Sequence, residues 1–116
     1  GAGSVPRCWL VWNQREFTLA AGEQIIGRDP ACAIWIDVDG VSRRHARIAL
    51  AGAGPDVHAV VEDLGSTNGT FIGARRLTRP QIVREGDAIE LGEVSLTFRT
   101  WLGADAPTKR VKPRQR

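Results

Sequence analysis

The sequence contains no long apolar run. No window approaches the roughly 18 to 20 apolar residues that a membrane-spanning helix requires, and the chain does not open with a basic segment followed by an apolar stretch. We therefore expect no signal peptide, no membrane association and a soluble protein that acts in the cytoplasm.

Cysteine is also scarce. Cys8 and Cys32 are too few for a disulfide framework, and Cys8 lies in an apolar run where a buried thiol is ordinary. His45 and His58 complete a set of four residues that could bind zinc, but no two of the four have the close spacing of a zinc-ligand pair. We expect reduced, structural thiols, no metal and no cofactor.

Lysine is missing from the first 102 residues. These carry 11 arginines against 12 carboxylates, or −1, so the net charge of +3 comes from residues 103–116, with a balance of +4. The planar fork of arginine suits phosphate, although a GC-rich bacterial genome would produce the same bias. The basic C-terminal segment leaves nucleic-acid association open as an alternative function.

Short segments of alternating or apolar character fill the chain between frequent turn residues. The expected strands cover residues 8–12, 16–19, 24–28, 33–36, 45–50, 57–64, 70–72, 75–77, 81–83, 88–91 and 94–98. This pattern predicts an all-β sandwich of two antiparallel sheets with about eleven short strands. We expect a leader over residues 1–6, one domain over 7–102 and a flexible basic tail or linker over 103–116.

Two polar loops stand out, Val41-Ser42-Arg43-Arg44-His45 and Leu64-Gly65-Ser66-Thr67-Asn68-Gly69-Thr70. The expected strands 45–50 and 57–64 lie between them and should pair, which returns the second loop to the side of the first. Hydroxyl, guanidinium and amide donors on tight turns can hold an anion. The loops therefore predict a binding module for a phosphorylated peptide.

These loops, together with Gly27-Arg28, Gly86-Asp87 and Leu91-Gly92, resemble the forkhead-associated (FHA) domain. The resemblance spans roughly residues 8–101. It implies an eleven-stranded sandwich that binds phosphothreonine peptides at loops on one end, acts in protein-kinase-dependent signalling and performs no catalysis. The expected partner is a threonine-phosphorylated protein or peptide, bound by a monomer.

The resemblance also implies roles for single residues. Arg28 would contact the phosphate, Ser42 and Thr67 would donate to it, Arg43 would add a backbone or side-chain donor, and Asn68 would bond the main chain of the peptide. Gly27, His45 and Gly69 would support the site. By residue type alone, Arg28 could instead form a surface ion pair with Asp29 or Asp37. The segments 73–79 and the one before Ser42 would form a pocket for a peptide residue that follows the phosphothreonine.

Two further hypotheses involve other chemistry. Ser42, His45 and Asp63 superficially suggest the nucleophile, base and orienting carboxylate of a small hydrolase, but no Gly-x-Ser-x-Gly elbow is present. We expect His45 to brace the two loops and the protein not to be an enzyme. Alternatively, Thr108 could itself be phosphorylated and dock on the site.

Overall fold

The computed structural model describes residues 7–101, so the expected leader and tail lie outside the described residues. The described chain forms eleven strands and one short 3₁₀ helix. The strands are β1 (Arg7–Trp12), β2 (Arg15–Thr18), β3 (Glu23–Gly27), β4 (Ile34–Trp35), β5 (Ala46–Ala51), β6 (His58–Asp63), β7 (Thr70–Ile72), β8 (Arg75–Arg76), β9 (Gln81–Val83), β10 (Ala88–Leu91) and β11 (Val94–Trp101), and the helix is η1 (Gly54–Asp56).

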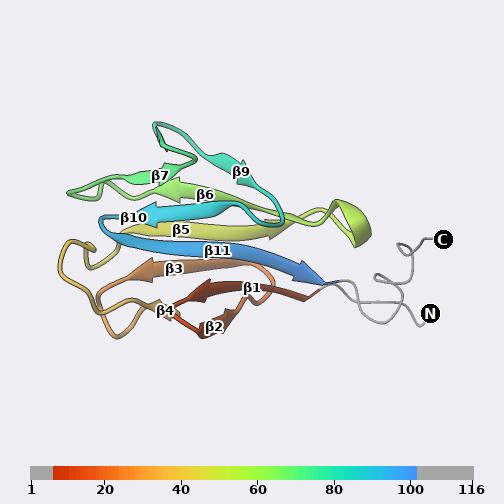
Figure 1. Ribbon diagram of the computed structural model, residues 1–116, viewed down its shortest axis with the longest axis horizontal. Helices are drawn as coiled ribbons and strands as arrows, with labels where there is room; N and C mark the ends of the chain where they lie inside the picture. The colour runs from red at the N-terminus through yellow and green to blue at the C-terminus, as the bar shows by residue number, and fades with distance from the viewer. Residues whose placement is uncertain (1–6, 102–116) are drawn as a thin grey trace.

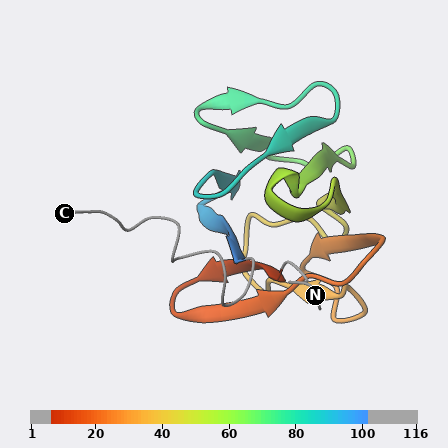
Figure 2. The same cartoon turned by 90° about the vertical axis from the view of Figure 1, so that its right-hand side faces the viewer.

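The strands form two sheets, as the alternating pattern predicts. One sheet has the order β2-β1-β11-β10-β7-β8 and the other β4-β3-β5-β6-β9, and the end-on view shows β1 and β11 on one side and β3 on the other (Figure 2). Every pair is antiparallel except β3 with β4, which is parallel. The prediction of two antiparallel sheets is confirmed, with this one short parallel edge added.

The core lies between the sheets and is built from the inward-facing positions of each strand. Leu10 of β1 stands opposite Phe98 of β11, and Ile48 of β5 stands opposite Val61 of β6. All four side chains are at most 1% exposed. Because alternate residues of a strand point to opposite faces, this burial fixes the register of both sheets.

The structure changes some expected boundaries. Leu77 is buried but lies outside β8, whereas β11 continues beyond residue 98 as far as Trp101. The turn expected over residues 51–56 contains η1, because Pro55 near its start has a preset φ that suits a helical turn.

The β5–β6 hairpin places the two polar loops side by side. Its register pairs Ala46, which directly follows the first loop, with Asp63, which directly precedes the second. The N–H of Leu64 then donates to the carbonyl of His45 at 3.0 Å. Both loops lie at the end of the sandwich opposite η1 (Figure 1). Within residues 7–101, no helix has the length and apolar character needed to cross a membrane.

Candidate functional site

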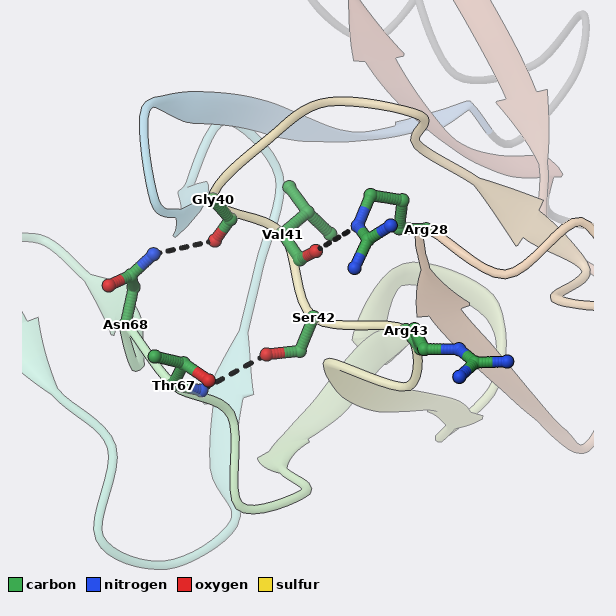
Figure 3. A pocket seen from close by; sticks show the side chains of 7 residues that line it. All are labelled: Arg28, Gly40, Val41, Ser42, Arg43, Thr67 and Asn68. Atoms are coloured by element: carbon green, nitrogen blue, oxygen red, sulfur yellow. Dashed lines mark hydrogen bonds between the residues drawn. The ribbon is translucent and has the colours of Figure 1, made fainter.

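A pocket of about 460 Å³ opens between the two polar loops. Its lining residues are Arg28, Gly40, Val41, Ser42, Arg43, Thr67 and Asn68 (Figure 3). All five residues predicted to bind a phosphopeptide therefore line one pocket, although they come from three separate segments. This juxtaposition depends on the sandwich, since Arg28 follows β3 while the others follow β4 or β6.

Arg28 is fastened to the first loop. Its backbone N–H donates to the carbonyl of Ser42 at 3.0 Å, and its side-chain Nε donates to the carbonyl of Val41 at 2.9 Å. The alternative of a surface ion pair is wrong for the described residues, because the ion pairs within 7–101 involve only Arg47 and Arg99. The two terminal nitrogens of Arg28 remain able to hold an anion through parallel hydrogen bonds.

Two side chains join the loops directly. The Ser42 Oγ accepts a hydrogen bond from the Thr67 N–H at 3.0 Å, and the Asn68 Nδ2 donates to the carbonyl of Gly40 at 2.8 Å. As an acceptor in this contact, the Ser42 hydroxyl keeps its own hydrogen for donation. The Asn68 side chain keeps its oxygen and a second N–H. The loops are thus joined without using up these groups.

Arg43 contributes in a narrower way than its residue type suggests. Its carbonyl accepts hydrogen bonds from the Asp29 N–H and the Cys32 thiol, both at 3.2 Å. Its side chain extends away from Ser42 and Thr67 (Figure 3), whereas its backbone N–H donates no hydrogen bond within residues 7–101. Of the two expected donors, the geometry favours the backbone N–H.

Gly27 is required by close packing rather than by an unusual φ. A Cβ at this position would lie 2.1 Å from the carbonyl oxygen of Arg43, far inside any real contact. The absence of a side chain lets the end of β3 approach the first loop closely enough for Arg28 and Asp29 to bond it. The expected supporting role of Gly27 thus has a definite steric cause.

His45 is fully buried and braces both loops, as the geometry of its ring shows. Its Nδ1 accepts from the Ser42 N–H and its Nε2 donates to the Gly69 carbonyl, each at 2.9 Å. Because an amide N–H only donates and a carbonyl only accepts, these partners assign the proton to Nε2. Gly69 itself has φ +86°, which suits glycine.

The suggested hydrolase triad is absent. Asp63 bonds residues of its own loop rather than His45, and the Nδ1 of His45 is occupied by the backbone of Ser42 rather than its hydroxyl. Neither an oriented base nor an activated nucleophile results from this arrangement.

Asp63 instead organises the second loop, a role that our sequence reasoning missed. Its carboxylate accepts hydrogen bonds from the Gly65 and Ser66 N–H groups and from the hydroxyls of Ser66 and Thr70. Burial by itself would raise the pKa of Asp63, but these four hydrogen bonds outweigh it and lower the pKa below 3.8. The Asp-x-x-Ser spacing of a side-chain-capped turn was the available signal.

The pocket expected for a neighbouring peptide residue is divided. Gly40 and Val41, which precede Ser42, line the pocket described above. Residues 77–80 instead line a separate pocket of about 240 Å³ with Glu62 and Asp63. The two segments thus line different pockets among the described residues, and the site for a neighbouring peptide residue stays a prediction.

The two cysteines do not form a ligand cluster. Both are free and buried, and burial is the main cause that raises the pKa of each thiol. Within residues 7–101, no three His, Cys, Asp or Glu side chains come together in a way that could hold a metal ion.

Comparison with known proteins gives this geometry a family context. The family model of the FHA domain matches residues 24–92. The chain is 33% identical over 82 residues to the FHA domain-containing protein FhaB of Mycobacterium tuberculosis, covering 71% of this chain and 50% of that protein. It thus spans about half the length of this curated relative.

Solved structures agree with the fold. A structure of phosphothreonine-dependent FHA domain interactions is 31% identical with a TM-score of 0.72, covering 80% of this chain and 95% of that one. Mycobacterium tuberculosis EmbR in complex with a low-affinity phosphopeptide is 28% identical with a TM-score of 0.69, covering 80% of this chain and 24% of that one. FHA domains are non-catalytic modules that bind phosphothreonine peptides in signalling. With its eleven strands, its two joined loops and these matches, the chain belongs to the FHA domain family.

Proposed function

We propose that the pocket between the two polar loops binds the phosphate of a phosphothreonine in a partner protein, and that Arg28 is the main residue that contacts this phosphate. The supporting observation is that Arg28 lines the same pocket as Ser42 and Thr67, and that within residues 7–101 its terminal nitrogens have no partner and no carboxylate lines this pocket. A phosphothreonine carries about −1.5 to −2 charges and three acceptor oxygens. Such a ligand needs this combination of one cation and several neutral donors.

In this proposal the remaining lining residues have different roles. The hydroxyls of Ser42 and Thr67 and the backbone N–H of Arg43 donate hydrogen bonds to the phosphate. Asn68 bonds the peptide main chain, since an amide both donates and accepts hydrogen bonds. Gly27, His45 and Gly69 hold the loops in place. This division explains why both loops must meet.

Phosphate contacts alone give moderate affinity. If each charge-assisted hydrogen bond contributes about 1.5 to 3 kcal/mol, three or four of them approach the roughly 8 kcal/mol of micromolar binding before the peptide is ordered. Peptide residues beside the phosphothreonine must therefore supply selectivity.

The module is non-catalytic in this proposal. The imidazole nitrogens of His45 both bond backbone groups, so Ser42 has no base. The domain holds its ligand and releases it unchanged. We place it as a monomer in the bacterial cytoplasm, where kinases phosphorylate threonine and free thiols such as Cys8 and Cys32 persist.

Two alternatives gain no support. The cations that suggested nucleic-acid binding, at residues 109–116, lie outside the described residues, and neither the fold nor the family favours that function. Thr108 also lies outside them.

The test is a fluorescence-anisotropy titration with a degenerate phosphothreonine peptide library and its phosphoserine and unphosphorylated counterparts. Loss of the charged hydrogen bonds predicts that Arg28→Ala weakens phosphopeptide binding roughly 10-fold or more. Arg84→Ala is the matched control, because Arg84 is exposed, follows β9 and does not line the pocket. Equal binding of phosphorylated and unphosphorylated peptides by the wild type would refute the proposal.

A further inference from the structure

Arg28 is held from two sides, and the second side is not part of the polar loops. The first loop bonds its N–H and its Nε, through the carbonyls of Ser42 and Val41. On the other side, the carbonyl of Arg28 accepts a hydrogen bond from the indole Nε1 of Trp35 at 2.8 Å. The N–H, the carbonyl and the Nε are thus all engaged, which leaves the terminal nitrogens for a ligand.

Trp35 reaches Arg28 because of the short parallel edge strand β4. Gly27 pairs with Trp35 in the register of β3 and β4, and the Ile36 N–H donates to the carbonyl of Gly27 at 2.9 Å. Ile34 and Ile36 are buried in the core, so the alternation of the strand turns Trp35 outward. The pairing of β3 with β4 ends at Gly27. The carbonyl of the next residue, Arg28, therefore accepts its hydrogen bond from a side chain, the indole of Trp35, rather than from the backbone of β4.

The exposure of Trp35 makes its position informative. The side chain is 43% exposed, and a large apolar ring in solvent contributes little to the core. Trp35 does not line the pocket, so any effect on a ligand must pass through another residue. The hydrogen bond of its indole ends on the residue that is best placed to hold the phosphate.

We propose that Trp35 is a positioning residue for phosphate binding, an inference that rests on the proposed function. By holding the carbonyl of Arg28, the indole N–H restrains the backbone from which the long arginine side chain departs. The Nε of Arg28 then donates to the Val41 carbonyl, and the terminal nitrogens are already directed to the pocket. Such preorganisation raises affinity because less conformational freedom is lost on binding.

Trp35→Phe tests this inference, because phenylalanine keeps an aromatic ring and lacks the N–H donor. The loss of one hydrogen bond near the surface predicts a two- to tenfold weaker affinity for the phosphothreonine library, with binding of unphosphorylated peptides unchanged. Trp101→Phe is the matched control, since Trp101 is 41% exposed and lies at the end of β11 away from the pocket. The urea midpoint of each variant separates this effect from global stability.

A double-mutant cycle distinguishes positioning from simple stabilisation. Arg28→Lys keeps the charge but removes Nε and the planar fork, so Trp35→Phe should cost less affinity in that background than in the wild type. Additive losses, or an unchanged affinity of Trp35→Phe, would overturn the role of Trp35 while the wild type still discriminates phosphorylated peptides. If the wild type itself fails to discriminate, both the proposed function and this inference fall.

Discussion

Replacement of Gly27 by alanine should disable the site through sterics alone. The added Cβ would lie 2.1 Å from the Arg43 carbonyl oxygen, whereas ordinary contacts begin at 3.4 Å, so the first loop must move by about 1 Å. That movement breaks the bonds from the Arg28 and Asp29 N–H groups to the loop, now 3.0 and 3.2 Å long. Two hydrogen bonds at about 0.5 to 1.5 kcal/mol each and an overpacking cost of about 1 to 3 kcal/mol predict a loss of roughly 2 to 6 kcal/mol.

Urea unfolding followed by tryptophan fluorescence measures this loss, and peptide titration measures the accompanying loss of phosphothreonine binding. Gly54→Ala is the control, because its Cβ would meet nothing within 4 Å and Gly54 begins η1, at the end of the sandwich opposite the two loops (Figure 1). Its φ of +55° should cost only about 1 to 2 kcal/mol and leave the affinity within about twofold of the wild type. A Gly27→Ala protein that unfolds within 0.5 kcal/mol of the wild type and binds normally would contradict the steric reasoning.

Three further perturbations test the bracing of the loops. Asp63→Asn should destabilise the protein by about 2 kcal/mol or more, since one amide oxygen cannot accept from all four donors. The pKa of Asp63 is lowered in the folded protein, so its carboxylate stabilises the fold above pH 4, and this stabilisation is lost as the pH falls through the folded pKa. Acid unfolding of Asp63→Asn should therefore depend less on pH in this range than that of the wild type. An unchanged pH profile would count against the stabilising role of Asp63. His45→Ala should cost at least about 2 kcal/mol by leaving the Ser42 N–H and Gly69 carbonyl unpaired, with chemical denaturation as the measurement and a stable, fully binding variant as the contrary result. Asn68→Ala should weaken the binding of the phosphorylated and the unphosphorylated form of a peptide by a similar factor, because Asn68 bonds the peptide main chain. Calorimetric titration of both forms measures the two affinities, and a loss confined to the phosphorylated form would contradict this role.

Local signals placed most of the strands correctly. Alternation of apolar and polar residues, together with turn residues such as Gly22 and Asp29-Pro30, depends only on neighbours in the chain. The β5–β6 hairpin was predictable for the same reason, and it brings the two loops together. The parallel pairing of β4 with β3 was not, because nothing local distinguishes a parallel edge of two residues.

The sequence by itself determined a β-sandwich with two donor-rich loops, because strand periodicity and turn chemistry are local properties. Only the tertiary structure decided which donor meets which acceptor: Asp63 bonds Ser66 and Thr70 rather than His45, and the Trp35 indole bonds Arg28. The bonds that join Arg28, Ser42 and Asn68 to their partners connect residues 13, 25 and 28 positions apart. Such contacts depend on how two packed sheets place their loop ends, which residue spacing along the chain does not encode.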